Sequence, residues 1–167
     1  MTIAYVGIGS NLDPEAHVQE AVKALIEAFP EVACSPVYRT EAVGFEGPAF
    51  LNLVARFRSE LPLEELMDRL RAIEDRFGRE RPEAGYGNRT LDLDLLLFGD
   101  RVSRKPVTLP RQDILAYPFV AKPLADLEPR GRHPELGRTF AELWATFPPG
   151  AGEDLEPVDL DPCGDPG

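Results

Sequence analysis

Residues 88–100 read NRTLDLDLLLFGD, a largely apolar stretch that contains two aspartates one residue apart. Alternation over such a run is typical of a β-strand, in which successive side chains point to opposite faces of the sheet. The pattern predicts that Asp92 and Asp94 share one face. The leucines predicted on the other face are Leu91, Leu93, Leu95 and Leu97. Because an unpaired buried carboxylate is costly, the aspartates also predict a cationic partner.

The segments before this strand predict a mixed α+β fold. Residues 2–10, 32–40 and 50–59 are rich in β-branched and aromatic residues, which favours strands. Amphipathic spacing predicts one helix that starts after Asp13 and a second helix over residues 63–77. The resulting order is that of a ferredoxin-like βαββαβ sandwich, with helices on one face of an antiparallel sheet.

Length and composition favour one globular domain. A chain of 167 residues can bury one core. We expect this domain to span residues 1–146, with short C-terminal helices wrapped on the core after residue 98. Residues 147–167 contain five prolines, four glycines and six acidic residues but no lysine or arginine. This tail is therefore expected to remain unfolded and mobile.

Charge and cysteine content restrict the expected partners. The net charge of −11 disfavours nucleic acids and anionic membranes, so a bound phosphate would need a local basic site. Cys34 and Cys163 lie far apart in sequence and are expected to be reduced thiols. With no basic-then-apolar leader and no apolar run of membrane length, the chain is predicted to be cytoplasmic. We also expect it to be a monomer.

Basic residues near the aspartates predict a site for phosphoryl chemistry. Arg79, Arg81 and Arg89 lie in or beside the glycine-rich segment GRERPEAGYGN, residues 78–88. Mg²⁺ prefers carboxylate oxygens, and cations around a carboxylate-bound metal ion suit phosphoryl transfer. The alternative is that the aspartates form ion pairs with these arginines at a solvated sheet edge.

Two other features predict a binding site on the same side. Phe50 and Asn52 share the side of their strand that faces away from the core, where a ring and an amide suit a flat ligand. The alternative is an ordinary half-exposed strand face. Glu74 falls inside the apolar stripe of the second helix, so it is predicted either to pair with an arginine or to face this site.

Several short sequence blocks are distributed over residues 2 to about 128, and their identity and order are informative. They are Gly9-Ser10-Asn11, Tyr38-Arg39-Thr40, Phe50-Leu51-Asn52, Gly78-Arg79, Arg89-Thr90-Leu91-Asp92-Leu93-Asp94 and Phe98-Gly99. This set resembles the 6-hydroxymethyl-7,8-dihydropterin pyrophosphokinases of folate biosynthesis. The resemblance implies transfer of the β,γ-pyrophosphoryl unit of ATP to the hydroxymethyl group of the pterin, with release of AMP.

The resemblance also implies roles for single residues. Asp92 and Asp94 resemble the ligands of two Mg²⁺ ions that bridge the triphosphate, and Arg79 and Arg89 resemble arginines that contact the phosphates and assist transfer. The positions that match the pterin pocket are Thr40, Val43, Phe50, Asn52 and Phe119. The positions assigned to the nucleotide are Glu74, Arg81, Leu95, Thr108 and Arg111.

The chain departs from the family pattern near the phosphates. Arg111-Gln112 stands where the family usually has His and a second polar or aromatic residue. Tyr117 replaces a common arginine, Tyr86 a frequent tryptophan, and Pro82 a position that can be basic. Arg111 is therefore predicted to supply the missing positive charge.

Two further classes of function also use ferredoxin-like sheets. An RNA-binding module would need a basic sheet face, whereas this chain is acidic and carries aspartates there. A regulatory domain would bind a pterin or a nucleotide without turnover, and it predicts binding without AMP production. His17 and His133 are predicted to have no catalytic role.

Overall fold

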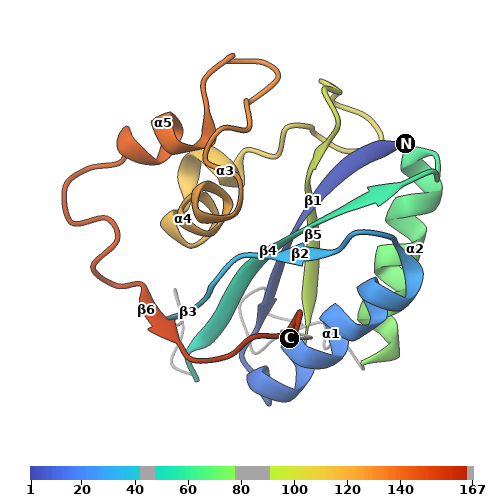
Figure 1. Ribbon diagram of the computed structural model, residues 1–167, viewed down its shortest axis with the longest axis horizontal. Helices are drawn as coiled ribbons and strands as arrows, with labels where there is room; N and C mark the ends of the chain where they lie inside the picture. Colours follow the sequence, from blue (N-terminus) through green and yellow to red (C-terminus); the bar gives the residue numbers. More distant parts are fainter. Residues whose placement is uncertain (42–47, 78–90, 165–167) are drawn as a thin grey trace.

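The computed structural model describes residues 1–41, 48–77 and 91–164, which form a mixed α/β fold around an antiparallel sheet (Figure 1). The strands are β1 (Thr2–Ser10), β2 (Ala33–Cys34), β3 (Val37–Thr40), β4 (Phe50–Ser59), β5 (Asp92–Phe98) and β6 (Glu156–Val158). The helices are α1 (Pro14–Ala28), α2 (Leu63–Arg76), α3 (Asp113–Ala116), α4 (Pro118–Leu127) and α5 (Phe140–Ala145). The prediction of a mixed fold with helices and an antiparallel sheet is confirmed.

The strand order β5-β1-β4-β3-β6 places the two longest strands, β1 and β4, in the middle of the sheet. The short β2 also pairs with β4, and every pairing is antiparallel. In register, Gly9 of β1 lies between Asp92 of β5 and Asn52 of β4. A Cβ atom at Gly9 would lie 3.2 Å from the Asn52 Oδ1 atom, so a glycine suits this close approach.

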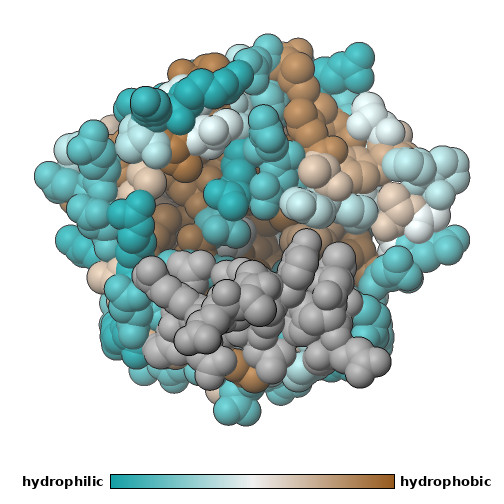
Figure 2. All heavy atoms as spheres, turned by 180° about the vertical axis from the view of Figure 1, so that it is seen from behind, coloured by the Kyte–Doolittle hydropathy of each residue, from teal (hydrophilic) through white to brown (hydrophobic). Residues whose placement is uncertain are grey.

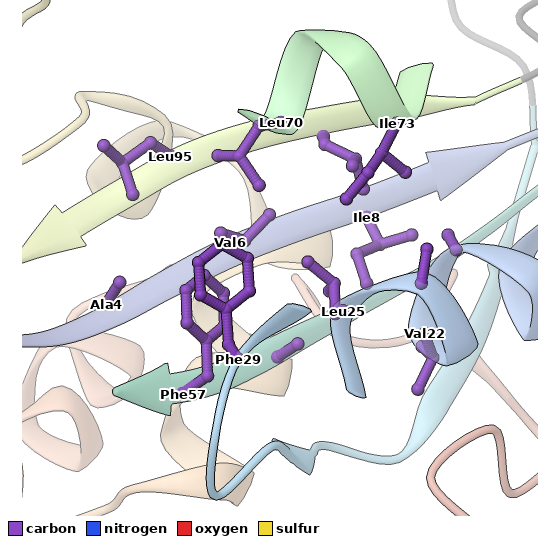
Figure 3. Packing of buried hydrophobic residues seen from close by; sticks show 14 of the residues in the cluster. Ala4, Val6, Ile8, Val22, Leu25, Phe29, Phe57, Leu70, Ile73 and Leu95 are labelled. Carbon is purple, nitrogen blue, oxygen red and sulfur yellow. The ribbon is translucent and has the colours of Figure 1, made fainter. Parts of the chain in front are cut away.

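One face of the sheet is covered by α1 and α2. Figure 3 shows side chains from β1, β4 and β5 packed against residues of these two helices. Phe29 and Phe57 stack with their ring centroids 4.2 Å apart. Both rings are buried, so this face forms a dry apolar core that ties the two helices to the sheet.

The other face is partly covered by the C-terminal helices, whereas α1 and α2, the two helices of the predicted core, lie together on one face as predicted. The buried residues of this second cluster are Val54, Leu96, Leu97, Ile114, Val120, Leu124, Ala125, Phe140 and Leu143. The position predicted for Leu97 is therefore wrong. A register shift between Tyr5 and Val6 interrupts the alternation, because such a bulge adds a residue to one strand.

The C-terminal segment also differs from the sequence prediction. Residues 147–167 were expected to remain unfolded, but β6 pairs with β3 at the edge of the sheet (Figure 1). Leu155 is buried, and Val158 and Leu160 pack against the first core. These apolar residues are few but spaced to reach the core, and Pro157 is tolerated because β6 is an edge strand.

The prediction of reduced thiols is also wrong, since Cys34 and Cys163 form a disulfide across 129 residues of sequence. This bond joins β2 to the segment after β6.

The view from behind shows hydrophilic side chains over much of the surface, with apolar side chains exposed between them (Figure 2). Within the described ranges, no helix has both the length and the apolar character needed to cross a membrane.

Candidate active site

Polar side chains gather at one end of the sheet, on the face opposite α1 and α2. Leu93 and Leu95 belong to the first core, so the alternation of β5 sends Asp92 and Asp94 to the other face. The register places Asp92 level with Asn52 across β1. The sequence prediction for the direction of these aspartates is therefore confirmed.

Asn52 is held by the neighbouring strand. Its Nδ2 atom donates a hydrogen bond to Thr40 Oγ1 at 2.8 Å, and the residue is buried. This bond fixes the plane of the amide and leaves the Oδ1 atom on the side of Gly9. Phe50 lies two pairs further along the same strands, opposite Thr40. The structure thus brings together three of the residues assigned to the pterin pocket.

Arg111 supplies positive charge beside the aspartates. Its Nη2 atom lies 3.7 Å from Asp94 Oδ1, and its Nε atom lies 3.2 Å from Asp113 Oδ2. Burial alone would lower the pKa of the Arg111 guanidinium, but the charges of Asp94, Asp113 and Asp92 outweigh it and raise that pKa. The positively charged Arg111 guanidinium is therefore held next to the pair Asp92 and Asp94. Sequence reasoning missed Asp113, although an acid two residues after an unusual arginine was the available signal.

Glu74 is buried in the apolar stripe of α2, where its carboxylate reaches the sheet. The Leu93 backbone N–H donates to Glu74 Oε2 at 2.7 Å. Leu93 lies between the two aspartates, so this charge-assisted bond fixes the backbone from which both project. The sequence predicted a partner for Glu74 but not a backbone group.

A cavity of about 460 Å³ opens beside Asp94, between α2, β5 and the chain that follows β5. Its lining residues are Met67, Leu70, Arg71, Glu74, Leu93, Asp94, Leu95, Pro106, Val107 and Arg111. Leu95, Glu74 and Arg111, all predicted to contact the nucleotide, therefore share one cavity. Thr108 follows the lining residue Val107 and is half-buried. Apolar walls next to charged groups suit a nucleotide.

Phe119 lies at the start of α4 and packs against the second core. The Tyr117 ring stacks on the Phe119 ring with centroids 5.1 Å apart and an interplanar angle of 23°. Tyr117, which replaces a common family arginine, thus supports the Phe119 ring by direct contact. The predicted site residues Val43, Arg79, Arg81 and Arg89 lie outside the described residues.

The carboxylate pair suits a magnesium ion that is bound jointly by the protein and by the phosphates of a substrate. In the part of the chain that the structure describes, no group of three or more His, Cys, Asp or Glu side chains could hold a metal ion. Mg²⁺ usually binds one or two carboxylates together with substrate phosphates and water. Asp92 and Asp94 are both partly exposed on one face, and carboxylates are hard oxygen donors of the kind that this mode uses.

Comparison with known proteins gives consistent matches. Residues 5–129 match the family described as 7,8-dihydro-6-hydroxymethylpterin-pyrophosphokinase (HPPK). A 2-amino-4-hydroxy-6-hydroxymethyldihydropteridine pyrophosphokinase of Pseudomonas aeruginosa is 43% identical over 150 residues, which cover 86% of this chain and 91% of that protein. The protein of the same name from Synechocystis sp. is 38% identical over 144 residues, covering 84% and 73%.

Solved structures agree with this match at the level of the fold. The crystal structure of a Plasmodium falciparum HPPK-DHPS triple mutant with pteroate superposes with a TM-score of 0.70 at 12% sequence identity. The superposition covers 93% of this chain but only 46% of that longer chain. With the family match over most of its sequence, the chain belongs to the 7,8-dihydro-6-hydroxymethylpterin-pyrophosphokinase family.

Proposed function

We propose that this chain is an ATP-dependent pyrophosphokinase that acts in folate biosynthesis. It transfers pyrophosphate from ATP to 6-hydroxymethyl-7,8-dihydropterin and releases AMP. Family membership supports the reaction. The observation that carries it is the shared end of the sheet, where Asp92, Asp94 and Arg111 lie on the same face as the Thr40–Asn52 pair.

The cavity beside Asp94 receives the nucleotide. Leu95 and the apolar residues around it contact the base, while Arg111 faces the phosphates. Thr108 borders this cavity, and Arg81 is assigned to the nucleotide from the sequence alone. Glu74 lines the cavity, but its bond to the Leu93 N–H makes its main task the support of β5. Support for this arrangement comes from the position of the cavity directly next to the carboxylate pair.

Asp92 and Asp94 are the residues that would hold two magnesium ions together with ATP. These ions would supply charge neutralisation at the triphosphate. Glu74 keeps the carboxylates in place through the backbone between them. Arg111 faces Asp94, and the triphosphate would offer this guanidinium a second anionic partner.

The pterin lies at the end of β3 and β4. The Asn52 amide and the Thr40 hydroxyl bond its edge, while Phe50 and Phe119 contact its ring faces, with Val43 completing the pocket. Asn52 is suited to this role because Thr40 fixes its amide plane. Rigid groups of this kind lower the ordering cost of binding.

The transfer step follows from this placement. The hydroxymethyl oxygen of the pterin attacks the β-phosphorus of ATP, the bond between that phosphorus and the oxygen of the α-phosphate breaks, and the hydroxyl proton is released. AMP leaves with the bridging oxygen. Arg79 and Arg89 stabilise the charge that develops on the phosphates, as proposed from the sequence. The protein's contribution is mainly positioning and electrostatic stabilisation.

Three broader features belong to the same proposal. The core is ferredoxin-like, which the order β5-β1-β4-β3 and the two helices on one face support. The protein is cytoplasmic and monomeric, and its partners are ATP and the pterin, with no nucleic acid or membrane. The acidic net charge supports the exclusion of nucleic acid.

An assay of AMP formation tests the reaction. The protein is incubated with ATP, Mg²⁺ and 6-hydroxymethyl-7,8-dihydropterin, and the nucleotide products are separated. AMP that depends on both the pterin and Mg²⁺ is expected. Formation of ADP alone would contradict attack at the β-phosphorus. Binding of both substrates without any AMP would favour a regulatory domain instead.

A further inference from the structure

The C-terminal end of α4 is bonded to two strands of the sheet. The Tyr38 hydroxyl of β3 donates a hydrogen bond to the Asp126 carboxylate of α4. Arg56 of β4 donates to Glu128, the residue that ends the same helix. We call these four side chains the α4 clamp.

The buried position of the Tyr38 side chain makes its bond to Asp126 the more valuable of the two. Tyr38 is 7% exposed, whereas the side chains of Arg56 and Glu128 are 33% and 31% exposed. Burial and the bond to Asp126 raise the pKa of the Tyr38 hydroxyl, so it remains a donor at neutral pH. Lys122 adds a second bond to Asp126 at 2.6 Å, which helps to hold that carboxylate in its orientation.

The clamp connects the two elements that carry the proposed pterin contacts. Tyr38 pairs directly with Asn52 in the sheet, two residues before Thr40. Asp126 belongs to the helix that begins next to Phe119. The spacing between Phe119 and the polar groups of β3 and β4 therefore depends on where α4 sits over the sheet.

Packing alone leaves this spacing less well defined. Apart from the α4 clamp, α4 packs against the sheet through apolar residues such as Val120 and Leu124, and apolar contacts have little directionality. Pro123 also interrupts the hydrogen bonding within the helix. Directional bonds at one end of α4 are thus suited to fix its position along the strands.

We propose that Tyr38 and Asp126, assisted by Arg56 and Glu128, are positioning residues that set the width of the pterin site. They act through α4 on Phe119 and through β3 on Thr40 and Asn52. The inference rests on the proposed pterin site and adds a specific dependence of pterin affinity on a bond outside that site. The nucleotide cavity shares none of these four residues, so ATP binding is independent of the clamp.

The test compares Tyr38→Phe, Asp126→Ala and Asp126→Asn with the unmodified protein. Tyr38→Phe removes only the hydroxyl, and Asp126→Asn retains an oxygen that accepts its bond. A matched control is Arg58→Gln, which removes the exposed ion pair with Glu31 eight residues along β4 from Phe50. The dissociation constant for the pterin is measured with a non-hydrolysable ATP analogue present, together with KM for each substrate and kcat.

The expected result is a dissociation constant and a KM for the pterin that rise about 3- to 10-fold in Tyr38→Phe and Asp126→Ala, the range for one lost hydrogen bond. Asp126→Asn and Arg58→Gln should stay within about twofold of the unmodified protein. KM for ATP should be unchanged throughout. Combining Tyr38→Phe with Asp126→Ala should add little, because both remove the same bond.

The inference is overturned if Tyr38→Phe lowers only the thermal midpoint and binds the pterin as tightly as the unmodified protein. It is equally overturned if Asp126→Asn and Asp126→Ala weaken pterin binding to the same extent. These results leave the proposed function intact, since that stands on AMP formation by the unmodified protein. Failure of the unmodified protein to form AMP would reject the proposed function instead.

Discussion

The two faces of β5 carry opposite kinds of side chain along the same four residues. Leu93 and Leu95 are buried in the core that α2 and α1 cover, whereas Asp92 and Asp94 are partly exposed on the other face. Helices α1 and α2 cover one face of the sheet, apart from the cavity that opens between α2 and β5. The other face is left open at the end where the polar residues gather.

This contrast shows how one strand separates stability from chemistry. On the covered face each side chain contributes through removal of apolar surface from water. On the open face a carboxylate contributes little to folding but provides a charge at a defined position. Changes on the open face should therefore affect mainly activity, and changes on the covered face should affect mainly stability.

The largest effect is expected for activity on the open face. Asp92→Asn and Asp94→Asn should each lower turnover by about 100-fold or more, because each removes a charge that the proposed phosphate site requires. Stability should change little, since Asp94 and Arg111 are 44% and 34% exposed and such pairs are worth about 1 kcal/mol or less. AMP formation at saturating Mg²⁺ and the thermal midpoint without metal are the two measurements.

The two measurements together distinguish a metal site from simple ion pairing with arginines. If the aspartates served only to pair with arginines, asparagine would lower the thermal midpoint and leave catalysis largely intact. A destabilised but fully active Asp94→Asn protein would therefore rule out the metal assignment. Asp94→Glu is a useful control, because it keeps the negative charge but moves the carboxylate away from its original position.

The next largest effect is expected for stability on the covered face. Phe57→Ala should lower the free energy of unfolding by about 3–5 kcal/mol, since the ring is buried and stacks on Phe29. Denaturant unfolding measures the loss. At a temperature where the variant is folded, its KM values should match those of the unmodified protein. Phe57→Leu fills most of the space and should lose less.

The covered face and the alternation of β5 could be predicted from the sequence because their signals are local. Strand alternation correctly predicted the face of the sheet on which Asp92 and Asp94 lie. Helical periodicity over residues 63–77 predicted α2, which spans Leu63–Arg76. The prediction for Leu97 failed because the register shift depends on the partner strand β1.

Contacts between distant parts of the chain could not be predicted. Asp126 and Tyr38 are 88 residues apart, and the two cysteines are 129 residues apart. The polar composition of the tail hid the few apolar residues that join it to the core. For the site, resemblance to the family supplied Thr40 and Phe119, while only the structure placed Arg111 beside Asp94.

A third effect tests whether the C-terminal segment belongs to the covered core. Reduction of the Cys34–Cys163 disulfide should destabilise the protein by about 2–4 kcal/mol, because it frees a long loop in the unfolded chain. The thermal midpoint is measured with and without a reductant. A Cys34→Ser/Cys163→Ser variant should match the reduced protein and should not respond to the reductant. An unmodified protein that is equally indifferent to reductant would show that the bond does not form in solution.

The smallest effect concerns pH and the buried His133 ring, for which the sequence predicted no catalytic role. The Nδ1 atom of His133 accepts hydrogen bonds from the backbone N–H groups of Glu135 and Leu136 at 3.3 and 3.1 Å. These bonds require the unprotonated nitrogen. Burial lowers the pKa of His133 below its usual value, and the charge of Glu135 offsets this only in part.

A lowered pKa in the folded state determines the sign of the effect. The unfolded chain binds a proton near pH 6.5, where the folded protein does not, so the contribution of His133 is fully present above that pH. It decreases as the pH falls from about 6.5 toward the lower pKa of the folded state. We therefore expect a small decrease in thermal midpoint between pH 7 and pH 5 that is absent in His133→Asn, whose amide oxygen can accept the same bonds without titrating. Activity at pH 7 should be equal in the two proteins, and identical pH profiles of their thermal midpoints would show that the ring does not contribute in this way.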